Sequence, residues 1–324
     1  MPGWRYGLWL AGIVLPAALA GAQPAAARSD PADQMVIDVG YRIAVKAGDL
    51  CPDPAPALGF TVQDLSQFAG ADRRRAIAQF ALGDTPQILA VAHGSVAERA
   101  GLMAGDDIVS AGGRAMPPMP KEAGTFDRVA QTLDLLDQAA AGGALTLVVR
   151  RDGEQRTLVL HLVEGCRSRF VVNVSRGLNS QADGEYVEVD TSLVAFARSE
   201  EQLAVVVAHE MAHNILGHRR RLAAERTIRG RRGRIAETRR TEDEADRYGV
   251  YLLDRAGFPP QAAAAFWARY GARRARLIHD GSHAPPAERV AMIEREIARL
   301  EAMKAGGQVP HPDFGSAPQS DAAR

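Results

Sequence analysis

A short pattern near the middle of the chain has the residue types and spacing of a metal-binding site. In the sequence HEMAH, residues 209–213, two histidines stand four positions apart. On a helix these positions lie on one face, one turn apart, so His209 and His213 can hold one tetrahedral Zn²⁺. Glu210 would reach the open fourth position, where it can take a proton from water and deliver it to the leaving amine. So short a motif also occurs by chance, and the alternative is a pair of histidines on a core helix.

A second, acidic segment can complete such a site. Glu242 begins the sequence EDEADRYG, and one carboxylate from a second helix would give a two-histidine, one-glutamate ligand set. Asp246, one turn further, can then hydrogen-bond the far nitrogen of a zinc histidine. The alternative is a solvated acidic run at a helix start, where negative charge is favourable. His218 competes as third ligand, but at about 100° per residue it points away from the face of His209. We therefore expect His218 at the surface or behind a ligand.

Three segments, in this order along the chain, resemble gluzincin peptidases of the HtpX, OMA and CAAX-prenyl-endopeptidase type, and among these the soluble periplasmic, BepA-like members. The segments are AVVVAHEMAHNILGH, EDEADRYG and SHAPPAERV, and the resemblance covers residues 167–300. It implies a zinc site and catalytic residues, which are the ligands His209, His213 and Glu242, the base Glu210, the orienting Asp246, and His283 beside the zinc.

The N-terminal half resembles a PDZ domain. The run SVAERAGLMAGDDIVSAGG follows the loop sequence Leu58-Gly59-Phe60, and a long helical pattern and an Asp-Gly hairpin come after it. The resemblance implies that the backbone N–H groups of Leu58, Gly59 and Phe60 capture the C-terminal carboxylate of an extended peptide. The alternative is that Leu58 and Phe60 are core residues of a groove that no longer binds peptide.

These patterns predict an α+β protein with two domains. A PDZ-like β-barrel domain over residues 51–165 precedes a mostly helical zincin metallopeptidase domain over residues 166–305. Residues 23–50 are expected to form a linker and a leading strand, and residues 306–324 a disordered tail.

The N-terminus has the features of a secretory signal peptide, residues 1–22. Arg5 precedes an apolar stretch, residues 7–20, and small residues suit cleavage near Ala22. The alternative is a membrane anchor, but the apolar run of about 14 residues is shorter than the ~20 that span a bilayer. We therefore expect a periplasmic or secreted protein.

Two cysteines, Cys51 and Cys166, stand at the two ends of the PDZ-like segment. In an oxidising compartment such a pair can form a disulfide, because PDZ-like domains bring their ends together. Two separate thiols are the alternative, and the sequence leaves both open.

Charge is balanced overall but concentrated locally. The formal net charge is +0, so nothing global points to nucleic acid. An arginine-rich stretch, residues 219–240, lies between the two metal motifs and contains Gly230 and Gly233. It is expected to be a mobile basic flap that attracts acidic substrate or an anionic membrane surface, or, alternatively, a solvated helix and loop.

The combined prediction is an exported metalloendopeptidase with one Zn²⁺ per chain that cleaves unfolded or misfolded polypeptides. The PDZ-like domain would bind substrate C-termini or regulate the enzyme. The alternative is a non-catalytic, chaperone-like binder with a structural zinc. Glu210 favours catalysis, because a structural site needs no general base. A serine protease with a PDZ domain is disfavoured, because no nucleophilic serine motif accompanies it.

Overall fold

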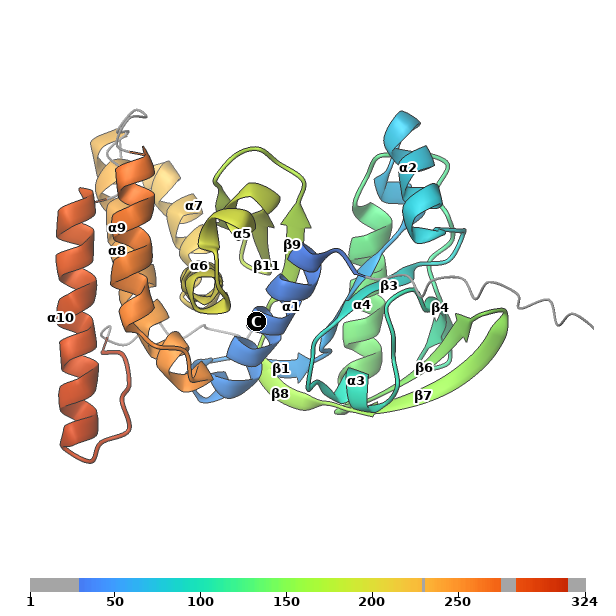
Figure 1. Cartoon of the computed structure of the whole chain (residues 1–324), viewed down its shortest axis with the longest axis horizontal. Helices are drawn as coiled ribbons and strands as arrows, with labels where there is room; N and C mark the ends of the chain where they lie inside the picture. Colours follow the sequence, from blue (N-terminus) through green and yellow to red (C-terminus); the bar gives the residue numbers. More distant parts are fainter. Residues whose placement is uncertain (1–28, 229–230, 275–283, 314–324) are drawn as a thin grey trace, which may run out of the picture.

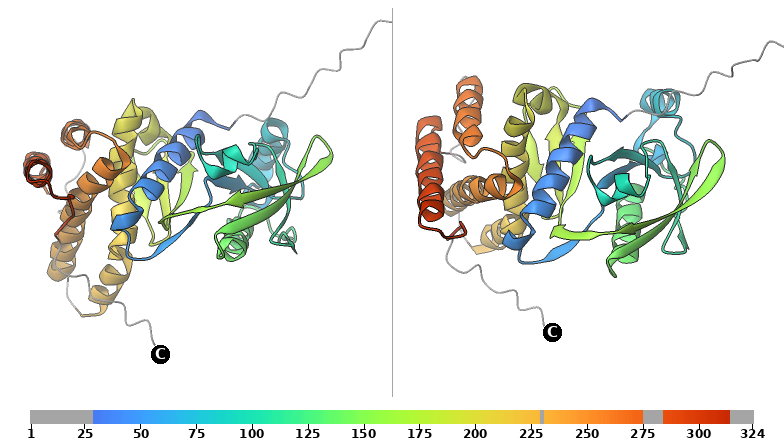
Figure 2. Two further views of the ribbon diagram at one scale, coloured as in Figure 1. Left: turned by 90° about the horizontal axis from the view of Figure 1, so that it is seen from below. Right: turned by 60° about the horizontal axis from the view of Figure 1, so that its bottom comes forward.

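Two lobes lie side by side in the computed structural model, which describes residues 29–228, 231–274 and 284–313 (Figure 1). One lobe is built mainly of helices and the other mainly of one sheet, and helix α1 lies between them in all views (Figure 2). The expected signal peptide, His283 and residues 314–324 of the tail lie outside the described residues. Among the helices that the structure describes, none has the length and apolar character needed to cross a membrane.

The strand lobe contains the largest sheet, in which the strands follow the order β2-β3-β4-β6-β7, and β5 pairs with β4. Its strands are β2 (Phe60–Gln63), β3 (Gln87–Val91), β4 (Asp107–Ala111), β5 (Arg114–Ala115), β6 (Ala144–Arg151) and β7 (Glu154–His161). Its helices are η2 (Leu65–Gln67), α2 (Gly70–Phe80), α3 (Val96–Arg99) and α4 (Asp127–Ala140). Strands β6 and β7 form the expected hairpin, and Asp152 and Gly153 in its turn both have positive φ.

The expected β-barrel is wrong, because the sheet is open. Strands β2 and β7 end it at opposite edges, and no described strand joins them. Strands of an open sheet and strands of a closed barrel have the same alternation of apolar and polar residues, so the sequence pattern could not distinguish the two architectures. The chain is a mixed α+β protein with open sheets.

The helical lobe combines a three-stranded sheet, in the order β10-β11-β9, with most of the helices. Its strands are β9 (Arg169–Asn173), β10 (Ser180–Ala182) and β11 (Tyr186–Asp190). Its helices are α1 (Pro31–Lys46), η1 (Gly48–Leu50), α5 (Thr191–Ala197), α6 (Glu200–Ile215), α7 (His218–Ile228), α8 (Arg231–Ala256), α9 (Gln261–Arg274) and α10 (Pro286–Ala305).

The expected linker and leading strand over residues 23–50 are wrong where residues 31–46 form helix α1. Asp30 caps this helix by accepting a hydrogen bond from the backbone N–H of Ala32, and Pro31 occupies the first turn. Proline is favoured there because its missing N–H would have no helical partner. Val36 and Ile43 are buried in the same core as α6, so α1 belongs to the helical lobe.

The strand lobe is therefore an insertion between α1 and β9. Strand β1 (Pro54–Ala57) leaves the helical lobe and pairs antiparallel with the returning strand β8 (Val163–Cys166). Cys51 and Cys166 form a disulfide at this junction, with their Cα atoms 5.4 Å apart. The covalent bond closes the insertion at its base.

Helix α6 crosses the centre of the helical lobe. Ser199 caps its start by accepting a hydrogen bond from the N–H of Gln202, and residues 203–212 are all buried. A helix that is buried on every side is held by its neighbours, here α1, α8, α9 and the small sheet. The chain reverses at Gly217, which has a φ of 63°, and α7 begins at once.

Candidate metal centre and active site

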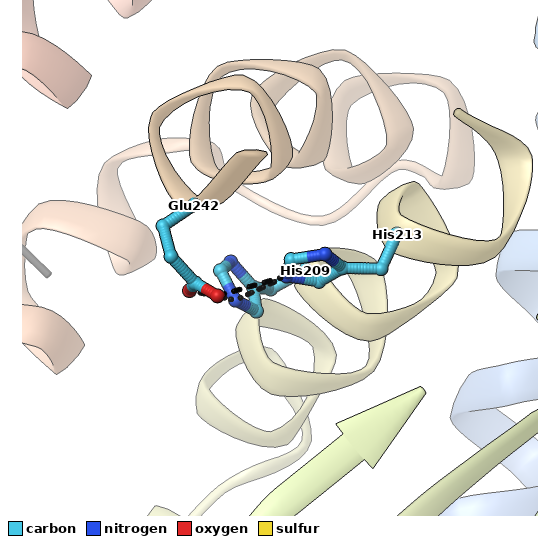
Figure 3. A group of neighbouring side chains, drawn as sticks. All are labelled: His209, His213 and Glu242. Atoms are coloured by element: carbon cyan, nitrogen blue, oxygen red, sulfur yellow. Dashed lines mark hydrogen bonds and ion pairs between the residues drawn. The ribbon is translucent and has the colours of Figure 1, made fainter. Parts of the chain in front are cut away.

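Two imidazoles and one carboxylate converge between α6 and α8 (Figure 3). The Nε2 atoms of His209 and His213 are 3.2 Å apart, and they lie 3.3 and 3.7 Å from the carboxylate oxygens of Glu242. In a tetrahedral site with bonds of about 2.0–2.1 Å, neighbouring ligand atoms are about 3.3 Å apart. The three side chains therefore fit a zinc ion by donor type and by separation.

His209 is held from behind by a buried carboxylate. Its Nδ1 lies 2.9 Å from Oδ1 of Asp246, and Arg289 donates to both oxygens of Asp246 at 2.6 Å. The Arg289 guanidinium also lies 3.3 Å from the ring centre of Trp267, which packs against His209. This chain of contacts fixes the ring of His209 and leaves its Nε2 facing Glu242.

The charges around His209 make the centre favourable for a cation. Burial lowers the pKa of His209, but the hydrogen bond and the charge of Asp246 outweigh it and raise the pKa to about 10. Burial also opposes ionisation of Asp246, yet the Arg289 guanidinium holds its pKa below the ordinary value. Asp246 therefore stays negative and favours positive charge at His209, from a proton or a metal ion.

His218 lies behind His213. The two Nδ1 atoms are 2.8 Å apart, and His218 is only 1% exposed. The expectation that His218 points to the other side of the helix assumed that α6 continues, but α6 ends at Ile215 and the turn at Gly217 brings His218 back. Of the two locations expected from the sequence, the surface is wrong, and the position behind a ligand is the one observed.

Glu210 faces an open cleft. It is buried, and Oγ of Ser180 donates a hydrogen bond of 2.6 Å to its Oε1. Burial raises the pKa of Glu210 above its ordinary value, while the charge of His209 and the bond from Ser180 oppose the rise. A carboxylate with a raised pKa is better matched to proton transfer near neutral pH.

The cleft has a volume of about 600 Å³ and is bordered by an edge strand. Strand β10 lines it, and among the described strands β10 pairs only with β11. The neighbouring strand β11 lies between β10 and β9, so it is not an edge of this sheet. Strand β10, with the sequence SQA, is too short and polar for a strand pattern to reveal it. Trp267 and Tyr270 of α9 also line the cleft, and no motif had marked them.

The other sequence-predicted residues lie elsewhere. The loop Leu58-Gly59-Phe60 is in the strand lobe, beside a groove of about 720 Å³ that β2 and α4 help to line. The arginine-rich stretch is helical wherever the structure describes it. Arg221 and Arg240 in it both form ion pairs with Glu237.

The fold and the site together define a metallopeptidase. Helices α6 and α8 present two histidines and a glutamate, and the buried carboxylate of Glu210 lies next to an edge strand and a cleft.

Comparison with known proteins supports this class over part of the chain. Residues 166–229 match the model of peptidase family M48. The β-barrel assembly-enhancing protease of Escherichia coli (strain K12) is 29% identical over 158 residues, which cover 37% of this chain and 32% of that protein. The putative β-barrel assembly-enhancing protease of Vibrio cholerae serotype O1 is 30% identical over 133 residues, covering 31% of this chain and 28% of that protein. Over part of its length the chain is therefore similar to M48 metallopeptidases of this type, and it spans about a third of the length of these relatives.

Proposed function

We propose that this protein is an exported, zinc-dependent metalloendopeptidase that cleaves unfolded or misfolded polypeptides in the cell envelope. The single observation that carries the proposal is the convergence of His209, His213 and Glu242 beside the buried carboxylate of Glu210. In this proposal the first three hold one Zn²⁺ per chain. Bound zinc would act as a Lewis acid on the substrate carbonyl and lower the pKa of water.

The chain's own residues supply the remaining chemistry. Glu210 accepts a proton from the attacking water and passes it to the leaving amine, and its raised pKa suits both steps. Asp246 keeps His209 oriented, and Arg289 keeps Asp246 ionised. We also include His283 as a candidate for contact with metal or substrate, because its segment leads into helix α10, which carries Arg289.

The edge strand argues for extended substrates. Strand β10 can add a substrate segment as a further strand, which places a peptide bond over Glu210. Only a locally unfolded polypeptide can present such a segment. An envelope role is supported by the signal-like N-terminus, by the disulfide and by the similarity to β-barrel assembly-enhancing proteases.

We further propose that the strand lobe is a PDZ-like module that binds substrate C-termini. Strand β2 is an edge of the described sheet, and α4 lines the groove opposite it. Gly59 has a φ of 73°, a backbone conformation that favours glycine and that can turn successive N–H groups toward a carboxylate. A C-terminal peptide would lie along β2 as an added strand.

The test measures metal content and cleavage of casein for the mature protein and for Glu210→Gln. Glu200→Gln, at the exposed first turn of the same helix, is the matched control. We expect one zinc in all three proteins, with cleavage reduced about 10²–10⁴-fold in Glu210→Gln alone. Full activity of Glu210→Gln, or absence of zinc from the wild type, would overturn the proposal. Zinc without cleavage in any of them would favour the chaperone-like binder.

A further inference from the structure

A buried network lies behind His213, on the side away from Glu242. His218 contacts His213, and Nε2 of His218 lies 3.2 Å from Oε2 of Glu244. The same oxygen of Glu244 accepts a hydrogen bond of 2.6 Å from Nη2 of Arg221, whose Nε donates to Glu237 at 2.8 Å. The side chain of His218 is 2% exposed, and those of Glu244 and Glu237 are 19% and 5% exposed.

We propose that His218, Glu244 and Arg221 form a relay that positions the metal ligand His213, as Asp246 and Arg289 do for His209. The proposal rests on the proposed function, because it concerns the same metal centre. His218 is here a positioning residue, since it touches neither metal nor substrate in this arrangement.

The hydrogen-bonding capacities of the three groups admit one proton arrangement. His213 directs Nε2 toward His209 and Glu242, so this nitrogen must offer its lone pair to a metal. Its Nδ1 then carries the hydrogen and donates it to Nδ1 of His218. The other nitrogen of His218 therefore carries a hydrogen, which it donates to the carboxylate of Glu244.

Both zinc histidines are then supported from behind, but in different ways. His209 reaches its carboxylate directly, whereas His213 reaches Glu244 through a second imidazole. In each case an arginine holds the carboxylate. A carboxylate that is bonded to a ligand imidazole fixes its tautomer and strengthens it as a ligand.

The relay also connects the arginine-rich helices to the metal centre. Arg221 lies on α7, while Glu237 and Glu244 lie on α8, seven positions apart and therefore on one face. Glu237 is buried, and a buried charge is costly unless it is paired, so Glu237 needs an arginine partner. The competing explanation is that the clamp only joins α7 to α8 and that His218 merely fills space.

Zinc affinity separates the two explanations. The dissociation constant for zinc would be measured by competition with a chelator. The unfolding midpoint of the metal-free protein and the rate of casein cleavage would be measured for the same variants. His218→Leu removes the relay, and His218→Asn keeps an acceptor near the position of Nδ1. Glu244→Gln removes the charge, and Arg220→Gln, at an exposed position on α7, is the control.

We expect His218→Leu to bind zinc about 10–100-fold more weakly than the wild type, and His218→Asn to recover most of the loss. Glu244→Gln should weaken binding to a smaller extent, and it carries the test if His218→Leu does not fold. Arg220→Gln should bind as the wild type does. Wild-type zinc affinity in both His218→Leu and Glu244→Gln would overturn the relay, even if their unfolding midpoints fall. A wild type that binds no zinc would overturn the proposed function and the relay with it.

Discussion

Replacement of Arg289 by methionine tests the buried ion pair behind His209. Arg289 donates to both oxygens of Asp246 at 2.6 Å, and the exposed fractions of the two side chains are 8% and 1%. Its guanidinium also stacks on Trp267. Methionine is shorter and uncharged, so the substitution removes the positive charge, the hydrogen bonds to Asp246 and the guanidinium contact with the ring.

The expected cost follows from the charge that is left behind. Removing one partner of a buried ion pair costs about 3–5 kcal/mol, because the other charge remains desolvated. Without Arg289, burial should raise the pKa of Asp246, and a protonated Asp246 supports His209 less well. We therefore expect Arg289→Met to lower the free energy of unfolding by about 3–5 kcal/mol and to weaken zinc binding about 10–100-fold.

The assay is urea unfolding of the metal-free protein at neutral pH, together with zinc competition. Arg299→Met, on the same helix, is the control, since its side chain is 41% exposed and its ion pairs with Glu296 and Asp313 are worth about 1 kcal/mol or less. Combining Arg289→Met with Asp246→Asn should recover part of the loss, because no charge is then left unpaired. A cost below about 1 kcal/mol with unchanged zinc affinity would refute the reasoning.

Two further predictions concern stability. The bond between Cys51 and Cys166 spans a sequence separation of 115, and closing a loop of that size restricts the unfolded chain by about 4–5 kcal/mol. Replacing both cysteines by serine should lower the free energy of unfolding by that amount in non-reducing urea titrations, and a change below about 1 kcal/mol would contradict it. Burial, together with the charge of Asp30, raises the pKa of Asp33 to about 7 from an ordinary value of 3.8. The folded protein then holds this proton longer than the unfolded chain, so stability is lost as the pH rises from about 4 to about 7. Asp33→Asn should raise the free energy of unfolding at pH 8, by at most about 4 kcal/mol, and should change it little at pH 4, whereas equal effects at both pH values would contradict the prediction.

Spacing along the chain was sufficient for the parts of the site that lie on one helix. His209, Glu210 and His213 share a turn of α6, and Glu242 and Asp246 share a turn of α8, as their positions in the sequence predict. Such predictions need only the helical repeat, which is a local property. The β6–β7 hairpin is local in the same sense, because its Asp-Gly turn selects the conformation.

The tertiary structure decided where helices end and which distant elements meet. His218 lies behind His213 because the chain reverses after α6, and Ser180 reaches Glu210 because a short edge strand lies over the helix. The sequence pattern predicts a linker and a leading strand where α1 forms, because only contact with remote helices shows that its apolar face is buried. Local periodicity predicts which residues share a face of a helix or strand. Which other element packs against that face depends on the burial of apolar surface across the whole chain.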